Sequence, residues 1–295
     1  MGSSRRALPL ADERPRRGPA GWVARGLVLG LVALVGLGAW LGGRSLFHSV
    51  LGPRCQATAA GSSVDFDPEQ MSNAATITAI ALRRGLPARA ATIALATAIQ
   101  ESKLRNIRYG DRDSVGLFQQ RPSQGWGTVE QILDPEYTTN KFYDALVKVD
   151  GWETGTITVV AQKVQRSAYP EAYAEHEQEG RILASSLAGH SPRGVGCRLD
   201  EPEGEADVAL IGRLLDAEYR LKASGGAGGT LTVRATSDQI AWSVASWSVA
   251  KAVDTGITGV TIGDRSWGRS RDSSAWEWQP AETPAAAGEV VLHLT

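Results

Sequence analysis

Histidine and cysteine are scarce in this 295-residue sequence, which contains four His and two Cys. Because these residues are also scattered, no local motif assembles a multi-ligand zinc or iron–sulfur site, and we expect neither a metal nor another cofactor. Basic and acidic residues almost balance, with 31 Lys+Arg against 32 Asp+Glu. The net charge of −1 provides no global basic field, so we expect no nucleic-acid partner.

Three common catalytic motifs are also missing. No Gly-x-Ser-x-Gly nucleophile elbow occurs. The sequence beginning His176-Glu177 lacks the second His of a zinc-peptidase helix. The glycine run 225–229 has no following Lys-Ser/Thr, so it is not a phosphate-binding loop. The enzyme classes that these motifs define are therefore excluded.

The N-terminal region has the pattern of a membrane anchor. Residues 1–25 carry six Arg among Gly, Pro and Ser, which predicts a disordered tail. Residues 26–43 then form an 18-residue run without a charge. As a helix this run would be about 27 Å long, close to the roughly 30 Å hydrocarbon core of a bilayer. Since the Arg excess precedes the run, the tail is predicted to be cytoplasmic and the rest of the chain extracytoplasmic.

Two alternatives to a single-pass anchor are less consistent with this region. A cleaved signal peptide usually has a shorter charged region and a small-x-small cleavage site, whereas this run ends in Trp-Leu-Gly-Gly-Arg. A buried core helix seldom shows such unrelieved apolarity between flanking arginines. The sequence therefore favours an uncleaved transmembrane helix.

An extracytoplasmic location predicts a disulfide between the two cysteines. Cys55 and Cys197 are 142 positions apart, and in an oxidising compartment they are expected to pair. Such a bond would join the ends of one domain. The sequence thus predicts a first domain over 55–197 and a second over 198–295.

The first domain is predicted to be mainly α-helical, with one long polar loop. Asp67 and Gln70 form a capping box that opens a helix closed by Gly85. Thr128 and Gln131 form another. Residues 106–127 are rich in Gly, Asp and Ser and are expected to form a loop or short hairpin. Further helices are predicted over 87–102, 135–149, 156–166 and 170–187.

Glu101 is the candidate catalytic residue. It lies at the C-terminal end of the predicted helix 87–102, where the negative end of the helix dipole disfavours ionisation. Its small and apolar neighbours would raise the carboxyl pKa further, as a general acid requires. The alternative is a surface ion pair between Glu101 and Arg105, which are spaced i,i+4.

The segment 114–128, SVGLFQQRPSQGWGT, identifies a family resemblance. Together with Glu101-Ser102 at a helix end, its Ser-x-Gly-Leu-Phe-Gln motif resembles the lytic-transglycosylase type of the lysozyme-like superfamily, over about residues 65–190. The resemblance implies a mainly α lysozyme-like fold that cleaves peptidoglycan. It makes Glu101 the general acid/base, and places Ser114 and Gln119 in the saccharide groove. Trp126 offers a flat apolar face for a sugar ring or, alternatively, packs its own loop.

The third motif of this family, Ala-Tyr-Asn, has no full match in the sequence. The candidates are Gln162, which follows Ala161, and Tyr169, which follows Ala168. Tyr169 would orient the Glu101 carboxyl or a substrate acetamide, or else it is a core residue. With Glu101 alone, the family mechanism uses the substrate acetamide and leaves an anhydro end. Hydrolysis would instead need a second carboxylate, for which Asp111 and Asp113 are candidates beside their alternative role in loop turns.

Residues 198–295 are predicted to form a small α+β domain after a Pro/Gly/Glu-rich linker. Expected elements are helices 208–219 and 238–254 and strands at 230–236, GVTI and EVVLHL. The stretch 242–267, WSVASWSVAKAVDTGITGVTIGDRSW, resembles part of a C-terminal module of bacterial cell-wall peptidases, whose last strand carries a His-x-His pair. Here His293 stands alone, so a non-catalytic binding or docking domain is predicted.

The sequence leaves two functions open. One is a membrane-anchored, extracytoplasmic enzyme, a lytic transglycosylase or muramidase, that cleaves peptidoglycan glycan strands. The other is a catalytically inactive lysozyme-like protein that binds the cell wall or acts as a scaffold. Both functions predict peptidoglycan as a partner and a membrane that the chain spans once, and the sequence leaves protein partners open.

Overall fold

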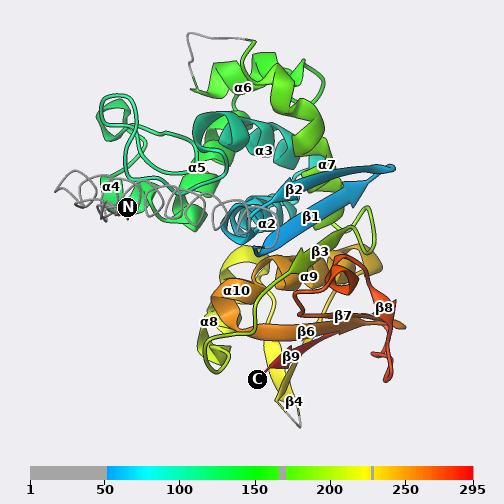
Figure 1. Cartoon of the computed structure of the whole chain (residues 1–295). Helices are drawn as coiled ribbons and strands as arrows, with labels where there is room; N and C mark the ends of the chain where they lie inside the picture. The colour runs from blue at the N-terminus through cyan, green and yellow to red at the C-terminus, as the bar shows by residue number, and fades with distance from the viewer. Residues whose placement is uncertain (1–51, 166–170, 227–228, 295) are drawn as a thin grey trace, which may run out of the picture. The chain divides into compact units, whose positions relative to one another are not determined.

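The computed structural model describes residues 52–165, 171–226 and 229–294. The predicted tail 1–25, the predicted transmembrane helix 26–43 and the candidate Tyr169 lie outside these residues. None of the described helices combines the length and the apolarity that a bilayer crossing requires. Over the described ranges the fold is mixed, with nine α-helices and two antiparallel sheets (Figure 1).

Local sequence signals position the helices of the first predicted domain. The Asp67–Gln70 capping box opens α2 (Pro68–Arg83), as predicted. The second helix, α3 (Ala88–Ser102), also lies where it was expected. The remaining elements of this region are α4 (Val129–Ile132), α5 (Pro135–Leu146), α6 (Ile157–Gln165), a 3₁₀ turn (Ala174–His176) and α7 (Glu177–Leu187).

Helix α3 is buried along most of its length, and close packing against α7 fixes its position. The contact surface of α3 is rich in Ala, whose small side chain allows neighbouring backbones to approach. At Gly180 of α7 an added Cβ atom would lie 2.9 Å from the carbonyl oxygen of Thr92. The glycine is therefore required where the two helices meet. This packing holds the C-terminal end of α3, and with it Glu101, in one place.

A three-stranded sheet was not predicted in this region. Strands β1 (Arg54–Ala59), β2 (Ser62–Phe66) and β3 (Val195–Arg198) pair antiparallel in the order β2-β1-β3. Cys55 and Cys197 are directly opposite each other in the β1–β3 ladder and form the predicted disulfide. The sequence predicted a mainly helical domain and did not indicate this sheet, which forms because the two ends of the region pair with each other.

The C-terminal region consists of a six-stranded antiparallel sheet and three helices (Figure 1). Helix α8 (Val208–Tyr219) has the predicted bounds. The predicted helix 238–254 is two helices, α9 (Asp238–Ala250) and α10 (Ala252–Thr255), because Lys251 ends one and precedes the other. The strands, in the order β4-β5-β9-β6-β7-β8, are β4 (Ala223–Gly226), β5 (Thr230–Arg234), β6 (Ile257–Ile262), β7 (Arg265–Gly268), β8 (Gln279–Pro280) and β9 (Glu289–Leu294). Of these, β4, β7 and β8 were not predicted.

A buried polar cluster joins α2 to the C-terminal helices. Glu218 of α8 is 2% exposed and accepts hydrogen bonds from Thr76 Oγ1 of α2 and from Trp247 Nε1 of α9. Lys251 Nζ lies 3.5 Å from Glu218 and donates to Thr76. Each buried charge thus faces its opposite and has hydrogen-bond partners, as burial demands. The cluster ties the two predicted domains together.

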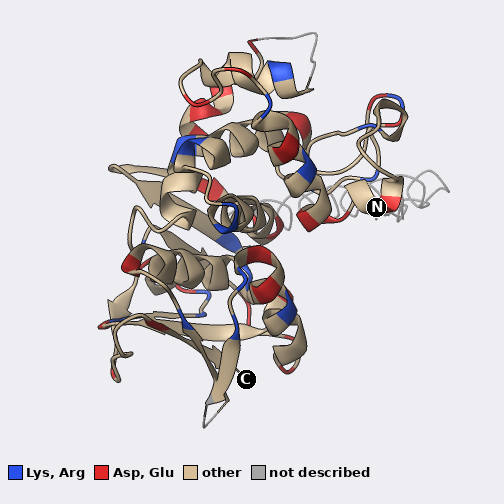
Figure 2. Cartoon of the chain, turned by 180° about the vertical axis from the view of Figure 1, so that it is seen from behind, with Lys and Arg blue, Asp and Glu red and all other residues tan. Residues whose placement is uncertain are grey.

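Acidic and basic residues are interspersed over the described helices and strands (Figure 2). This distribution agrees with the near-zero net charge of the whole chain. A local group of like charges therefore stands out from its surroundings, and two such groups occur in pockets of the molecule.

Candidate functional site

The end of α3 positions Glu101 beside the long polar loop. The helix stops at Lys103, whose backbone has a left-handed φ of 56°. Ser102 Oγ donates a 2.7 Å hydrogen bond to the carbonyl oxygen of Leu117, which attaches the loop to the helix end. The Glu101-Ser102 pair and the Gly-Leu-Phe-Gln segment, the two motifs singled out in the sequence, are therefore adjacent in space.

Among the described residues, Glu101 has two hydrogen-bond donors and forms no ion pair with a cationic side chain. Tyr173 Oη donates to Glu101 Oε1 at 2.7 Å, and the Gln165 side chain donates to the same carboxyl group. Arg105 instead forms ion pairs with Asp67 and Glu69, so the alternative pairing with Glu101 is not formed. The structure therefore does not support the alternative in which Glu101 is half of a surface ion pair with Arg105.

Burial controls the protonation of Glu101. Removal of the carboxyl group from water raises its pKa above the ordinary value of 4.5, because burial penalises the charged form. The hydrogen bonds from Tyr173 and Gln165 stabilise the carboxylate and partly offset this effect, but the pKa remains raised. A half-buried carboxyl group with a raised pKa suits proton donation to a substrate.

Four of the predicted site residues meet in one pocket of 260 Å³. It contains Glu101 together with Ser114, Gln119 and Trp126. The pocket is polar, so it suits a hydroxyl-rich ligand more than an apolar one. Its other lining residues are Asp111, Gln120, Arg121, Gln124 and Gln165. The predicted Gln162 is not among the lining residues, although it lies three residues before Gln165 on α6.

The motif loop is fixed by its glycine and by two buried side chains. Gly116 has a φ of +79°, and an added Cβ atom there would lie 2.7 Å from the Ile132 carbonyl oxygen, so no other residue fits. Leu117 and Phe118 are fully buried. Phe118 stacks on Phe142 with ring centroids 4.5 Å apart. The apolar positions of the motif thus hold the loop, while its polar positions face the pocket.

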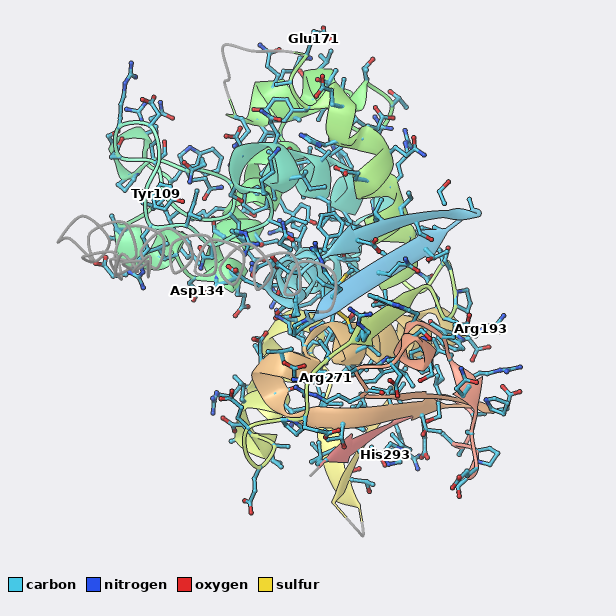
Figure 3. The ribbon with its side chains drawn as sticks, in the orientation of Figure 1. Tyr109, Asp134, Glu171, Arg193, Arg271 and His293 are labelled. Atoms are coloured by element: carbon cyan, nitrogen blue, oxygen red, sulfur yellow. A yellow bond between two sulfur atoms is a disulfide. The ribbon has the colours of Figure 1, made fainter. Side chains whose placement is uncertain are left out.

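Gln119 is partly committed to its own loop. Its backbone is left-handed, with a φ of 47°. Its side-chain Nε2 donates to the carbonyl oxygens of Tyr109 and Gly116, at 3.3 and 3.2 Å. Because the amide nitrogen has these partners, Gln119 has its oxygen to offer to a ligand. Tyr109 itself is 74% exposed and projects from the same loop (Figure 3).

Sequence reasoning missed three residues of the site: Gln120, Gln165 and Tyr173. Gln120 is 2% exposed, its oxygen accepts from Thr138, and its Nε2 has no hydrogen-bond partner in the described part of the chain. A buried donor without a partner is unusual in folded proteins, which sets Gln120 apart from the other residues of the pocket. Tyr173 had a detectable signal, since Ala172-Tyr173 repeats the Ala-Tyr pair considered at 168–169.

The two candidate second carboxylates have different roles. Asp113 accepts hydrogen bonds from Arg121 Nε and from the backbone and side chain of Ser123. These donors hold the pKa of the Asp113 carboxyl well below its usual range, and they commit it to the loop. Asp111 lines the pocket, and its side chain is largely exposed to solvent. Asp111 is therefore the better candidate for a second carboxylate.

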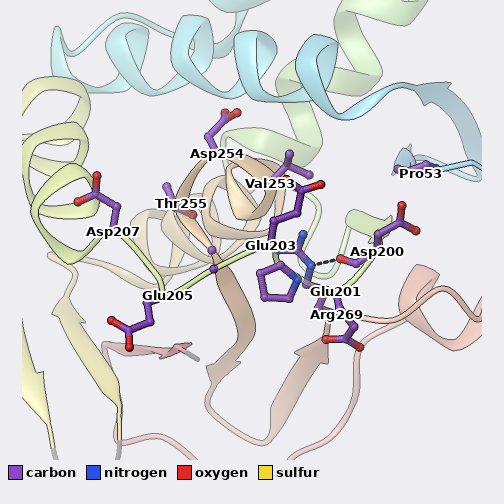
Figure 4. Close-up of a pocket in the computed structure, with 13 residues that line it drawn as sticks. Pro53, Asp200, Glu201, Glu203, Glu205, Asp207, Val253, Asp254, Thr255 and Arg269 are labelled. Atoms are coloured by element: carbon purple, nitrogen blue, oxygen red, sulfur yellow. Dashed lines mark hydrogen bonds between the residues drawn. The ribbon is translucent and has the colours of Figure 1, made fainter.

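A second pocket, of 440 Å³, is lined by acidic side chains (Figure 4). Several of these acids already have structural partners. Asp207 caps α8 through Leu210 N, and Asp254 accepts a hydrogen bond from Ser72. Asp200 forms an ion pair with Arg271, and its carbonyl oxygen accepts from Arg269. These contacts involve three of the six acidic residues that line the pocket, and no group of His, Cys, Asp and Glu in the described residues is arranged to hold a metal ion.

His293 is placed on the last strand, β9, with no second histidine beside it (Figure 3). Its Nε2 lies 2.8 Å from Thr261 Oγ1 on the neighbouring strand. Burial lowers the pKa of the imidazole, because it penalises the charged form. The ring therefore has a hydrogen-bonding role within the sheet, and the binding or docking role of this region stays a prediction.

No protein-family model matches the chain. No curated protein matches it either.

Proposed function

We propose that this protein is a membrane-anchored, extracytoplasmic enzyme that cleaves the glycan strands of peptidoglycan with Glu101 as its single general acid/base. The proposal includes the lysozyme-like character of the first domain and the single N-terminal membrane span. The observation that carries it is the environment of Glu101: a half-buried carboxyl group with a raised pKa that opens into a polar pocket.

The surroundings of Glu101 support a saccharide as the ligand. The pocket contains side-chain amides, which both donate to and accept from sugar hydroxyl and acetamido groups. Gln120 supplies an unpaired donor, and Trp126 provides an aromatic face at the rim. Tyr173 and Gln165 hold the carboxyl group in position. These contacts would place a glycosidic oxygen within reach of the Glu101 proton.

In the proposed reaction, Glu101 is the one residue that both gives a proton to the substrate and removes one from it. Glu101 donates its proton to the glycosidic oxygen, the bond from that oxygen to the anomeric carbon breaks, and the acetamide oxygen of the same sugar bonds to the anomeric carbon. The Glu101 carboxylate then removes the proton of a hydroxyl group on that sugar. The hydroxyl oxygen displaces the acetamide and leaves an anhydro end, with Glu101 protonated again. If Asp111 activates water instead, the product is a reducing end.

The test is to digest purified peptidoglycan strands with the full-length chain in detergent and to determine the ends by mass spectrometry. Anhydro ends support the transglycosylase route, and reducing ends support hydrolysis. Strands that bind the protein but stay intact would instead support the inactive wall-binding or scaffold alternative. Strands that neither bind nor break would refute both functions.

A further inference from the structure

A lysine-lined pocket adjoins the candidate site. It has a volume of 430 Å³ and shares two lining residues, Gln124 and Trp126, with the pocket that contains Glu101. Three of its other lining residues are Lys141, Lys148 and Lys163. The whole sequence contains only six lysines, so half of them line this one hollow. We refer to it as the lysine pocket.

The described residues that line the lysine pocket do not neutralise the charge of its three lysines. Lys141 lies on α5 and its ammonium group is 5.4 Å from the centre of the Tyr137 ring. Lys148 and Lys163 are exposed. The single carboxylate that lines the pocket, Asp144, is paired with Arg84 at 2.8 Å. Among the described residues, the three lysines form no ion pair, and they leave a local positive field in a nearly neutral molecule.

A glycan strand bound at Glu101 would continue into this field. Since Trp126 and Gln124 line both hollows, the two form one continuous surface. The hydroxyl and acetamido groups of the sugars are uncharged, so they do not account for three lysines. In a peptide-bearing strand the lactyl carboxyl group of the sugar forms the amide bond to the stem peptide, and the free carboxylates are those of the peptides.

We propose that the lysine pocket binds the carboxylates of the stem peptides on the strand that is cut at Glu101. This inference rests on the proposed function and names the form of the substrate: peptide-bearing rather than bare glycan. The lysines would act on substrate affinity and orientation, and the chemistry would remain with Glu101.

The experiment measures binding separately from turnover. Calorimetry on the full-length Glu101→Gln chain in detergent determines the Kd for two sets of soluble glycan strands of one length. One set carries stem peptides, and in the other, the bare strands, each lactyl carboxyl group is capped as an uncharged amide. The test variant adds Lys148→Gln and Lys163→Gln. The matched control adds Arg213→Gln and Lys222→Gln, which remove the same charge from exposed positions of the C-terminal region. Cleavage by the wild-type chain is scored in a parallel digestion.

The expected result is a loss of about fivefold in affinity for peptide-bearing strands in the lysine variant, the sum of two exposed charge contacts. The loss should shrink at high salt, because the contacts are screened. Bare strands should bind all three chains equally. An equal loss on bare strands, an unchanged affinity, or absence of any binding would overturn the inference.

A glycerol-phosphate wall polymer serves as a further ligand. If it binds in a lysine-dependent way and stem peptides make no difference, the pocket recognises phosphate polymers and the proposal is wrong. Lysine-dependent binding of peptide-bearing strands with no cleavage by the wild-type chain would keep the inference and defeat the proposed activity, so the two failures are distinguishable.

Discussion

Removal of the Cys55–Cys197 disulfide should cost this protein a large part of its stability. The bond joins residues 142 positions apart. In the chain-entropy relation, a cross-link across so long a loop restricts the unfolded chain and stabilises the native state by about 5 kcal/mol. Typical net stabilities of folded proteins are roughly 5–15 kcal/mol. Both cysteines are fully buried in the β1–β3 ladder, so Ala at each position adds no bulk to the native sheet.

The assay is urea unfolding of the full-length chain in detergent, followed by tryptophan fluorescence, since Trp247 and Trp267 are fully buried. The Cys55→Ala/Cys197→Ala variant should unfold at a much lower urea concentration than the oxidised wild type. Reduced wild type should resemble the variant, and a reductant should not affect the variant itself. A loss below about 1 kcal/mol would show that the chain-entropy argument does not describe this domain.

Two further predictions concern the site and the buried cluster. Tyr173→Phe removes a hydrogen bond that lowers the pKa of Glu101, so this pKa should rise. The alkaline limb of the pH–rate profile should then move to higher pH. An unmoved limb would contradict the assigned contact. Glu218→Leu should lower the free energy of unfolding by about 3–5 kcal/mol, because it leaves the Lys251 charge buried without its partner. The double variant Glu218→Leu/Lys251→Met should recover much of that loss in the same urea assay, and equal destabilisation of both variants would refute the pairing argument.

The helix starts marked by capping boxes were the most predictable part of this fold, because they depend on neighbouring residues, whereas the predicted helix 170–187 begins only at Glu177. The capping boxes Asp67–Gln70 and Thr128–Gln131 are both formed in the structure. The disulfide was also predictable, since the chain has two cysteines and the N-terminal pattern predicts an oxidising compartment, which together leave one pairing. In each of these cases the deciding interaction is specified by a few residues.

The strands of the first region could not be predicted, because their partners are distant. Strand β1 pairs with β3 across more than a hundred residues, and no short pattern indicates that pairing. The candidate site likewise has residues that the sequence predicted and residues that it did not. Glu101 and the motif loop were recognised from adjacent residues, whereas Tyr173 and Gln165 reach the carboxyl group only through the packing of α6 and the segment before α7.

The lysine pocket also depends on tertiary structure. Lys141 and Lys148 lie seven positions apart on and just after α5, and Lys163 lies on α6. In the sequence they are ordinary isolated charges. Their proposed common function depends on α5 and α6, which bring them around one hollow beside Trp126.

The most direct test of the account is the rate at which the Glu101→Gln chain cleaves peptidoglycan strands. Gln keeps the size and hydrogen-bonding capacity of Glu but has no transferable proton, so the rate should fall by about 10²–10⁴-fold while the urea midpoint stays near that of the wild type. Glu69→Gln, at an exposed carboxylate that pairs with Arg105, is the matched control and should keep the wild-type rate. A Glu101→Gln chain that cuts glycan as fast as the wild type would contradict the catalytic role of Glu101.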